Sequence, residues 1–231
     1  MNNLYKKHTK PTKFIFVTGA GHSGTRLVMS ILGQHPAISI PFNHLNSVHE
    51  FIPLHKFFVK CLTKTSFNSK KYFLDKTNLN LILEKYKNLC NIEKIVTIKM
   101  PYYPLNYLNE IRAILGDVIF LGVKRNTDKI INSYKRRNQH IKFFELEKTH
   151  HIKKLNYTIR KSFYNKTPIE ILRVHINEIN MAMKKNDLLI FDMEKLISNG
   201  SIYINSIFNS LSLPIVIKDL SKIINKGRLI K

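Results

Sequence analysis

The chain has 231 residues, of which 44% are hydrophobic, and a formal net charge of +23 at pH 7. This composition is typical of a soluble globular protein with one sizeable core, and no apolar run approaches the roughly 20 residues that a membrane-spanning helix needs. The charge favours polyanionic partners such as a nucleotide, an acidic glycan, nucleic acid or an anionic membrane surface. We give it limited weight, because a Lys-rich composition can follow from gene nucleotide content alone. Nucleic acid is the least favoured of these partners, since no nucleic-acid-binding module is recognisable.

The cellular setting and the domain organisation follow from simple features of the chain. Cys61 and Cys90 have no metal-binding or redox spacing, so we expect free thiols in a reducing compartment. Residues 1–13 are polar and basic, without a signal-peptide core. We therefore predict a soluble cytoplasmic protein with a flexible basic tail over residues 1–12 and a single domain over residues 13–231.

Apolar runs alternate with amphipathic segments along the chain. Taken in order, the pattern predicts a strand at 14–18, a helix at 25–34, a strand at 37–40, helices at 47–61 and 78–89, a strand at 95–99, a helix at 105–115, a strand at 118–123, helices at 128–139 and 168–184, a strand at 188–191, a turn at 192–198 and a helix at 202–211. Residues 140–166 form either two short helices or a mobile flap in this interpretation, and the chain ends in a short basic tail.

Strands that alternate with helices indicate βαβ units. The predicted fold class is therefore α/β, a P-loop-like three-layer sandwich with a central, mostly parallel sheet and helices on both faces. In such sheets ligands bind at the carboxyl ends of the strands. Two candidate anion-binding motifs, one after Val17 and one after Val123, follow strands in this way.

The first motif is a glycine-rich turn between a buried strand and a helix. Glycine lets the backbone approach an anion, and the following helix directs its free N–H groups at that anion. Gly19 and Gly24 have the Walker A spacing, but Thr25-Arg26 replaces its Lys-Ser/Thr pair. The motif therefore predicts a phosphate loop rather than an ordinary ATPase site. A plain βα turn without a ligand is the alternative.

The second motif joins Arg125, at the end of a strand, to Ser133, eight residues later in a helix. A guanidinium and a hydroxyl that converge on one point suit a phosphate monoester. The spacing alone is common by chance and gains specificity only together with the glycine loop.

With both motifs in place, the sequence resembles the sulfotransferase family, whose donor is 3′-phosphoadenosine 5′-phosphosulfate (PAPS). Four blocks match in the right order across residues 13–213, namely 21–26 with 32–36, 98–101, 120–125 with 133–134, and 189–196. The chain contains no Trp, so it is more similar to the carbohydrate and protein sulfotransferases than to the small-phenol enzymes, which carry a Trp after the loop.

This resemblance implies roles for several of the matched residues. The loop residues that would hold the 5′-phosphate and sulfonate are Gly21, His22, Ser23, Gly24, Thr25 and Arg26. Arg125 and Ser133 would hold the 3′-phosphate. The implied reaction is in-line transfer of a sulfuryl group to a hydroxyl or amine without a metal, which requires electrostatic clamps and one base.

Two catalytic assignments stay open. His22 stands where the family usually has Lys or Arg: a protonated His22 would bridge the leaving phosphate, Arg26 or Lys99 would substitute for it, or His22 would only shape the loop. For the general base, Glu50 ranks slightly above His44, with His49 third. Asp192 and Glu194 are expected to cap or brace the last helix.

Three functions are compatible with these residues. The leading one is a PAPS-dependent sulfotransferase acting on a glycan, or on a protein tyrosine or small alcohol. A P-loop nucleoside or nucleotide kinase is the second, although neither a Walker lysine nor a Mg²⁺ site is recognisable. The third is a non-catalytic relative that binds a nucleotide or an acidic glycan.

Overall fold

The computed structural model describes residues 13–40, 76–87, 95–99, 105, 108–137 and 166–214. The predicted tail at 1–12, the predicted helix at 47–61, the segment 140–165 and the end of the chain lie outside these residues. So do His44, His49 and Glu50. Among the described residues, no helix is long and apolar enough to cross a membrane.

A five-stranded sheet forms the centre of the molecule, with strand order β2-β3-β1-β4-β5. Its strands are β1 (Phe14–Gly19), β2 (Ile38–Ser39), β3 (Ile95–Lys99), β4 (Val118–Lys124) and β5 (Leu189–Asp192). Every pairing is parallel. The central strand β1 is buried along its whole length, as expected for a strand covered on both faces.

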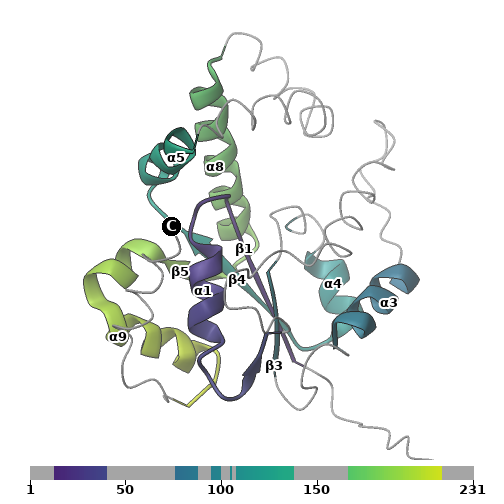
Figure 1. Ribbon diagram of the computed structural model, residues 1–231. Helices are drawn as coiled ribbons and strands as arrows, with labels where there is room; N and C mark the ends of the chain where they lie inside the picture. Colours follow the sequence, from purple (N-terminus) through teal and green to yellow (C-terminus); the bar gives the residue numbers. More distant parts are fainter. Residues whose placement is uncertain are drawn as a thin grey trace, which may run out of the picture.

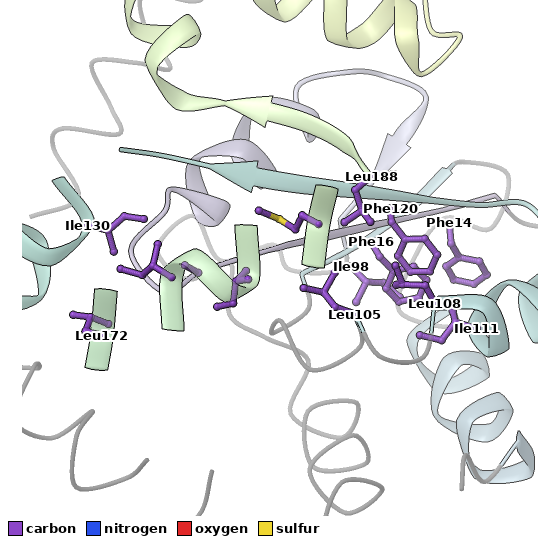
Figure 2. Close-up of a cluster of buried hydrophobic side chains, with 14 of the residues drawn as sticks. Phe14, Phe16, Ile98, Leu105, Leu108, Ile111, Phe120, Ile130, Leu172 and Leu188 are labelled. Atoms are coloured by element: carbon purple, nitrogen blue, oxygen red, sulfur yellow. The ribbon is translucent and has the colours of Figure 1, made fainter. Parts of the chain in front are cut away.

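Helices cover both faces of the sheet (Figure 1). They are α1 (Thr25–Leu32), α3 (Lys76–Lys87), α4 (Leu108–Leu115), α5 (Thr127–Arg136), α8 (Pro168–Lys185) and α9 (Met193–Ser210). Buried side chains of α1 and α9 meet one face, in a cluster that contains Ile15 and Val17 of β1. Those of α3, α4, α5 and α8 meet the other, around Phe14 and Phe16 (Figure 2). Alternate β1 residues thus serve opposite cores, and the predicted three-layer α/β sandwich is confirmed.

The predicted elements within the described residues are confirmed, with small shifts at their ends. The strand at 95–99 has the predicted bounds, and Pro168 begins α8 as expected. One predicted element is wrong. Residues 193–198, predicted as part of a turn, are helical, and α9 runs from there to Ser210 across a kink at Gly200, whose φ is 47° and ψ −118°.

Candidate functional site

The glycine loop connects β1 to α1 and shapes the helix start. Ser23 N–H donates to Ala20 O (3.1 Å), and Val28 N–H donates the first helical bond to Gly24 O (3.1 Å). Gly24, the N-cap residue, has φ +105° and no side-chain cap, a conformation that favours glycine. The first-turn N–H groups of a helix have no intrahelical acceptor, so the amino end of α1 is suited to an anion.

Ser23 lies inside this loop and is completely buried. Its hydroxyl has no hydrogen-bond partner in the described part of the chain. Leaving a buried hydroxyl unpaired costs about 1–3 kcal/mol, so such a group is a candidate contact for a bound ligand. Thr25, two residues later, is also buried, with 8% of its surface exposed.

Arg125 brings the second predicted motif to the first. It follows β4, which lies beside β1 with Gly19 opposite Val123. The Nη1 atom of Arg125 donates to the carbonyl oxygen of His22 (3.1 Å). Its Nε atom is buried and has no hydrogen-bond partner within the described segments. One donor of the guanidinium therefore holds the loop while another remains for a ligand.

His22 is the residue through which the two motifs touch. Its φ is 62°, and its Nδ1 hydrogen-bonds with Ser133 Oγ at 2.9 Å. Its ring centroid lies 4.1 Å from that of Tyr134. Tyr134 also supports the loop, because its hydroxyl occupies the space that a Cβ on Gly21 would need, 2.1 Å away.

The positions of the other two predicted cationic residues, Lys99 and Arg26, follow from the sheet register and from exposure. Lys99 is the last residue of β3 and lies opposite Val17 in the parallel register, so it stands at the same edge of the sheet as the glycine loop. Arg26 is exposed in the first turn of α1. The structure thus joins the loop, Arg125 and Ser133 directly, and it places Lys99 near them by register.

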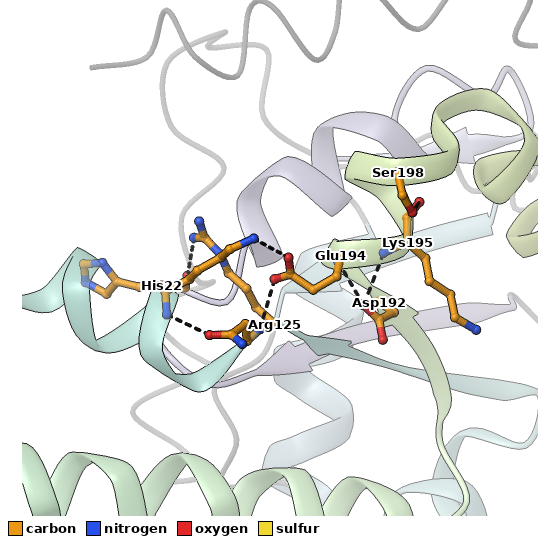
Figure 3. Close-up of polar contacts among 8 residues, drawn as sticks. His22, Arg125, Asp192, Glu194, Lys195 and Ser198 are labelled. Atoms are coloured by element: carbon orange, nitrogen blue, oxygen red, sulfur yellow. Dashed lines mark hydrogen bonds and ion pairs between the residues drawn. The ribbon is translucent and has the colours of Figure 1, made fainter.

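Asp192 and Glu194 have separate roles (Figure 3). Asp192 caps α9, as predicted, by accepting from the N–H groups of Glu194 (2.9 Å) and Lys195 (3.4 Å). The carboxylate of Glu194 is not the cap of α9. It accepts from the Asn126 N–H (3.1 Å) and forms an ion pair with Lys129, both at the start of α5.

The hydrogen bond from Lys129 is the main cause that lowers the pKa of Glu194, and the Asn126 N–H and the charges of Lys129 and Arg125 act in the same direction against burial. Glu194 therefore presents a carboxylate to this turn at neutral pH. Asn126 and Tyr134 contact these residues; Tyr134 stands with Ser133 in a block that matches the family, but neither residue was assigned a role from the sequence. The adjacency of Tyr134 to Ser133 was the available signal for one of them.

Comparisons with known proteins bear on the family and the fold. Residues 14–179 match the family model described as the sulfotransferase family. Solved structures with a similar fold include a sulfotransferase from Alicyclobacillus acidocaldarius, with a TM-score of 0.53, 16% identity and coverage of 92% of this chain and 85% of that one. Another is a sulfotransferase from Mycobacterium avium, with a TM-score of 0.52, 9% identity and coverage of 95% and 69%.

The sulfotransferase domain of the Synechococcus PCC 7002 olefin synthase has a TM-score of 0.51 at 12% identity, with coverage of 91% and 76%. No curated protein matches the chain. At these identities the solved structures establish the fold, and the family model, which covers more than half of the residues, establishes the family. On the evidence of its glycine loop, its Arg125 turn and this match, the chain belongs to the sulfotransferase family.

Proposed function

We propose that the protein transfers a sulfuryl group from PAPS to a hydroxyl or amine of an acceptor, and that this acceptor is a carbohydrate. The observation that carries the proposal is a pair of buried polar groups without partners in the described residues, Ser23 Oγ and Arg125 Nε. They come from neighbouring strand ends that are joined through His22. A nucleotide with phosphates at its 5′ and 3′ positions would supply acceptors for both.

Each residue would have a defined task toward this donor. The amino end of α1, with Ser23 and Thr25, would hold the 5′-phosphate and sulfonate, and Arg125 and Ser133 would hold the 3′-phosphate. When bound, PAPS supplies the activated sulfuryl group together with its own leaving group. The chain then has to orient the donor and stabilise charge, which is the usual source of rate acceleration in such transfers.

The contact between His22 and Ser133 fits this division of tasks. A hydroxyl donates one hydrogen bond and accepts up to two. When Nδ1 of His22 carries a proton it donates to Ser133 Oγ, so the hydroxyl proton of Ser133 stays available for a phosphate oxygen. A protonated His22 would therefore add positive charge at the loop and keep Ser133 competent. Arg26 and Lys99 remain the substitutes, and Glu50 and His44 remain the candidate bases.

The two alternatives have weaker support. A nucleoside or nucleotide kinase would need a lysine at the position of Thr25 to reach the transferred phosphate. A non-catalytic nucleotide- or glycan-binding relative would keep the same pocket without turnover. A cytoplasmic location and a single domain over residues 13–231 complete the proposal.

Calorimetric titration with adenosine 3′,5′-bisphosphate in buffer containing a chelator tests the donor assignment. We expect binding without metal and weak binding of ATP with Mg²⁺. Arg125→Ala should weaken bisphosphate binding by one or two charge-assisted hydrogen bonds, about 1.5–3 kcal/mol each. Unchanged affinity in Arg125→Ala would refute the 3′-phosphate assignment, and a preference for ATP with Mg²⁺ would favour the kinase.

A transfer assay with labelled PAPS over a panel of glycans, tyrosine peptides and small alcohols completes the same experiment. We expect label in a glycan, and we expect His22→Ala to lower turnover more than bisphosphate affinity. Binding without transfer to any acceptor would favour the non-catalytic relative. If His22→Ala turned over as fast as the wild type, His22 would serve only to shape the loop.

A further inference from the structure

The turn that carries Arg125 is held from outside by a residue of another element. Asn126 caps α5 with its side chain, which accepts from the Lys129 N–H (3.1 Å). The backbone N–H of Asn126 is left for a different acceptor and donates to Glu194 Oε1 (3.1 Å). Lys129 pairs with the second carboxylate oxygen. The two carboxylate oxygens of Glu194 thus hold the backbone N–H of Asn126 and the side chain of Lys129, both at the start of α5 (Figure 3).

The hydrogen bond from Asn126 also affects Arg125, because the donating N–H is part of the peptide unit that joins these two residues. The Asn126 N–H belongs to the peptide unit that begins with the carbonyl carbon of Arg125. A peptide unit is planar and rigid, so a carboxylate that fixes this N–H also fixes the rotation about the Cα–C bond of Arg125. Glu194 therefore holds the carbonyl side of the Arg125 backbone and the start of α5 in place, while the Arg125 side chain donates to His22 O.

Sheet topology explains why Glu194 can reach this turn. β4 and β5 are adjacent and parallel, with Lys124 opposite Asp192. Glu194 lies two residues past the end of β5, and Asn126 lies two residues past the end of β4. The task of capping α9 falls to Asp192, which leaves the Glu194 side chain for the neighbouring turn.

We propose that Glu194 is a positioning residue for the 3′-phosphate site: it orients Arg125 and so sets the preference for a 3′,5′-bisphosphate over a 5′-monophosphate. The inference rests on the proposed function, because it assigns the 3′-phosphate to Arg125. Glu194 acts through Arg125. Its carboxylate also forms an ion pair with Lys129.

The test compares the affinities of adenosine 3′,5′-bisphosphate and adenosine 5′-monophosphate, measured by titration calorimetry on the full chain. Glu194→Ala should weaken bisphosphate binding about tenfold, the effect of one impaired charge-assisted hydrogen bond, and change monophosphate binding by less than about twofold. Glu194→Gln keeps an acceptor for the Asn126 N–H, so its loss should be smaller than that of Glu194→Ala.

Two further variants separate positioning from general stability. Asp128→Asn removes another exposed ion pair of α5, the one with Arg173, and should leave the ratio of the two affinities unchanged. In the double variant Arg125→Ala/Glu194→Ala, the Glu194 change should add no further loss of bisphosphate affinity, since a residue that acts through Arg125 has no effect once Arg125 is gone.

The outcomes distinguish the inference from the proposed function. If the wild type binds both nucleotides equally, the donor site is wrong and the inference falls with it. If the wild type discriminates and Glu194→Ala keeps the full ratio, the inference alone is wrong. Equal losses for both nucleotides, or additive losses in the double variant, would also overturn it.

Discussion

His22 makes contacts that residues of an ordinary connecting turn do not make. Its carbonyl oxygen accepts from Arg125 and its ring hydrogen-bonds with Ser133, so one loop residue is tied to two positions of the neighbouring βα unit. The adjacent Tyr134 ring packs against the imidazole. The glycine loop and the second turn are therefore joined by direct contacts at His22.

Gly21 offers a direct test of this packing. A Cβ at Gly21 would lie 2.1 Å from the Tyr134 hydroxyl and 3.2 Å from the ring carbon that carries it. Gly21→Ala should therefore displace the loop or the ring and weaken bisphosphate binding, at a cost of about 1–3 kcal/mol, as for overpacked sites. Calorimetric titration and a thermal melt measure the two effects.

The matched control removes the obstructing atom. In Gly21→Ala/Tyr134→Phe the closest group becomes a ring edge rather than a hydroxyl, so most of the lost affinity should return. Tyr134→Phe alone gives the baseline for the double variant. Normal binding in Gly21→Ala, or no recovery in the double variant, would show that Tyr134 does not limit the space above Gly21.

At the scale of elements, the predictions that were confirmed rest on local signals. The apolar run 95–99 and the proline that begins α8 can each be recognised from a few consecutive residues, and both elements appear where expected. The glycine loop was equally readable, because a strand, a Gly-rich turn and a helix follow one another directly. Gly24 accordingly adopts the positive φ that only glycine takes easily.

The contacts that could not be predicted from the sequence join segments that are far apart along the chain. Glu194 and Asn126 are 68 residues apart, and His22 and Ser133 are 111 apart. Their meeting depends on strand order, which the alternation of elements does not specify. Asp192 and Glu194 were expected to cap or brace the last helix; Asp192 forms the cap, and Glu194 connects α9 to Asn126 and Lys129 at the start of α5.

Helix α8 provides a prediction that depends on pH. Thr167 and Glu170 form a capping box at its start, and the hydrogen bond from the Thr167 backbone is the main cause that lowers the pKa of Glu170 from its ordinary 4.5. A carboxyl with a lowered pKa in the folded state stabilises the fold above its unfolded pKa, and this contribution is lost as the pH falls through its folded pKa. Glu170→Gln should therefore reduce the free energy of unfolding near neutral pH and have no effect in strong acid.

Glu178, on the same helix, supplies a control of opposite sign. Burial raises its pKa, so its contribution is favourable below the unfolded pKa and is lost as the pH rises through the folded one. Glu178→Gln should thus be more stable than the wild type near neutral pH, with the difference disappearing in acid. Urea unfolding at both pH values measures each variant. A Glu170→Gln effect that is the same at both would contradict the charge argument.

At the scale of the whole molecule, residues that are far apart along the chain complete the core on the α1 and α9 face of the sheet. In the layer of α1 and α9, His35 connects the segment after α1 to the segment after α9, and it is 1% exposed. Its Nδ1 accepts from the Ala37 N–H (3.1 Å), so in the neutral ring its Nε2 carries the proton and donates to Pro214 O (3.0 Å). Its ring lies 5.1 Å from that of Phe208.

This contact spans 179 residues and lies past the carboxyl end of α1, whereas the glycine loop lies at its amino end. His35→Ala removes both hydrogen bonds and leaves the Pro214 carbonyl without its donor, so the free energy of unfolding should fall by about 2–4 kcal/mol. Bisphosphate affinity of the folded protein should stay unchanged, because the amino end of α1 keeps its own contacts. Urea unfolding and calorimetric titration give the two quantities.

Gln34→Ala is the matched control, since Gln34 is exposed and makes one long hydrogen bond of 3.4 Å to Ser30 O. It should change stability by no more than about 0.5 kcal/mol. A His35→Ala protein as stable as Gln34→Ala would show that the α1 and α9 layer closes without this histidine. A selective loss of bisphosphate affinity at unchanged stability would instead couple His35 to the site along α1, because the two ends of one helix would then respond together.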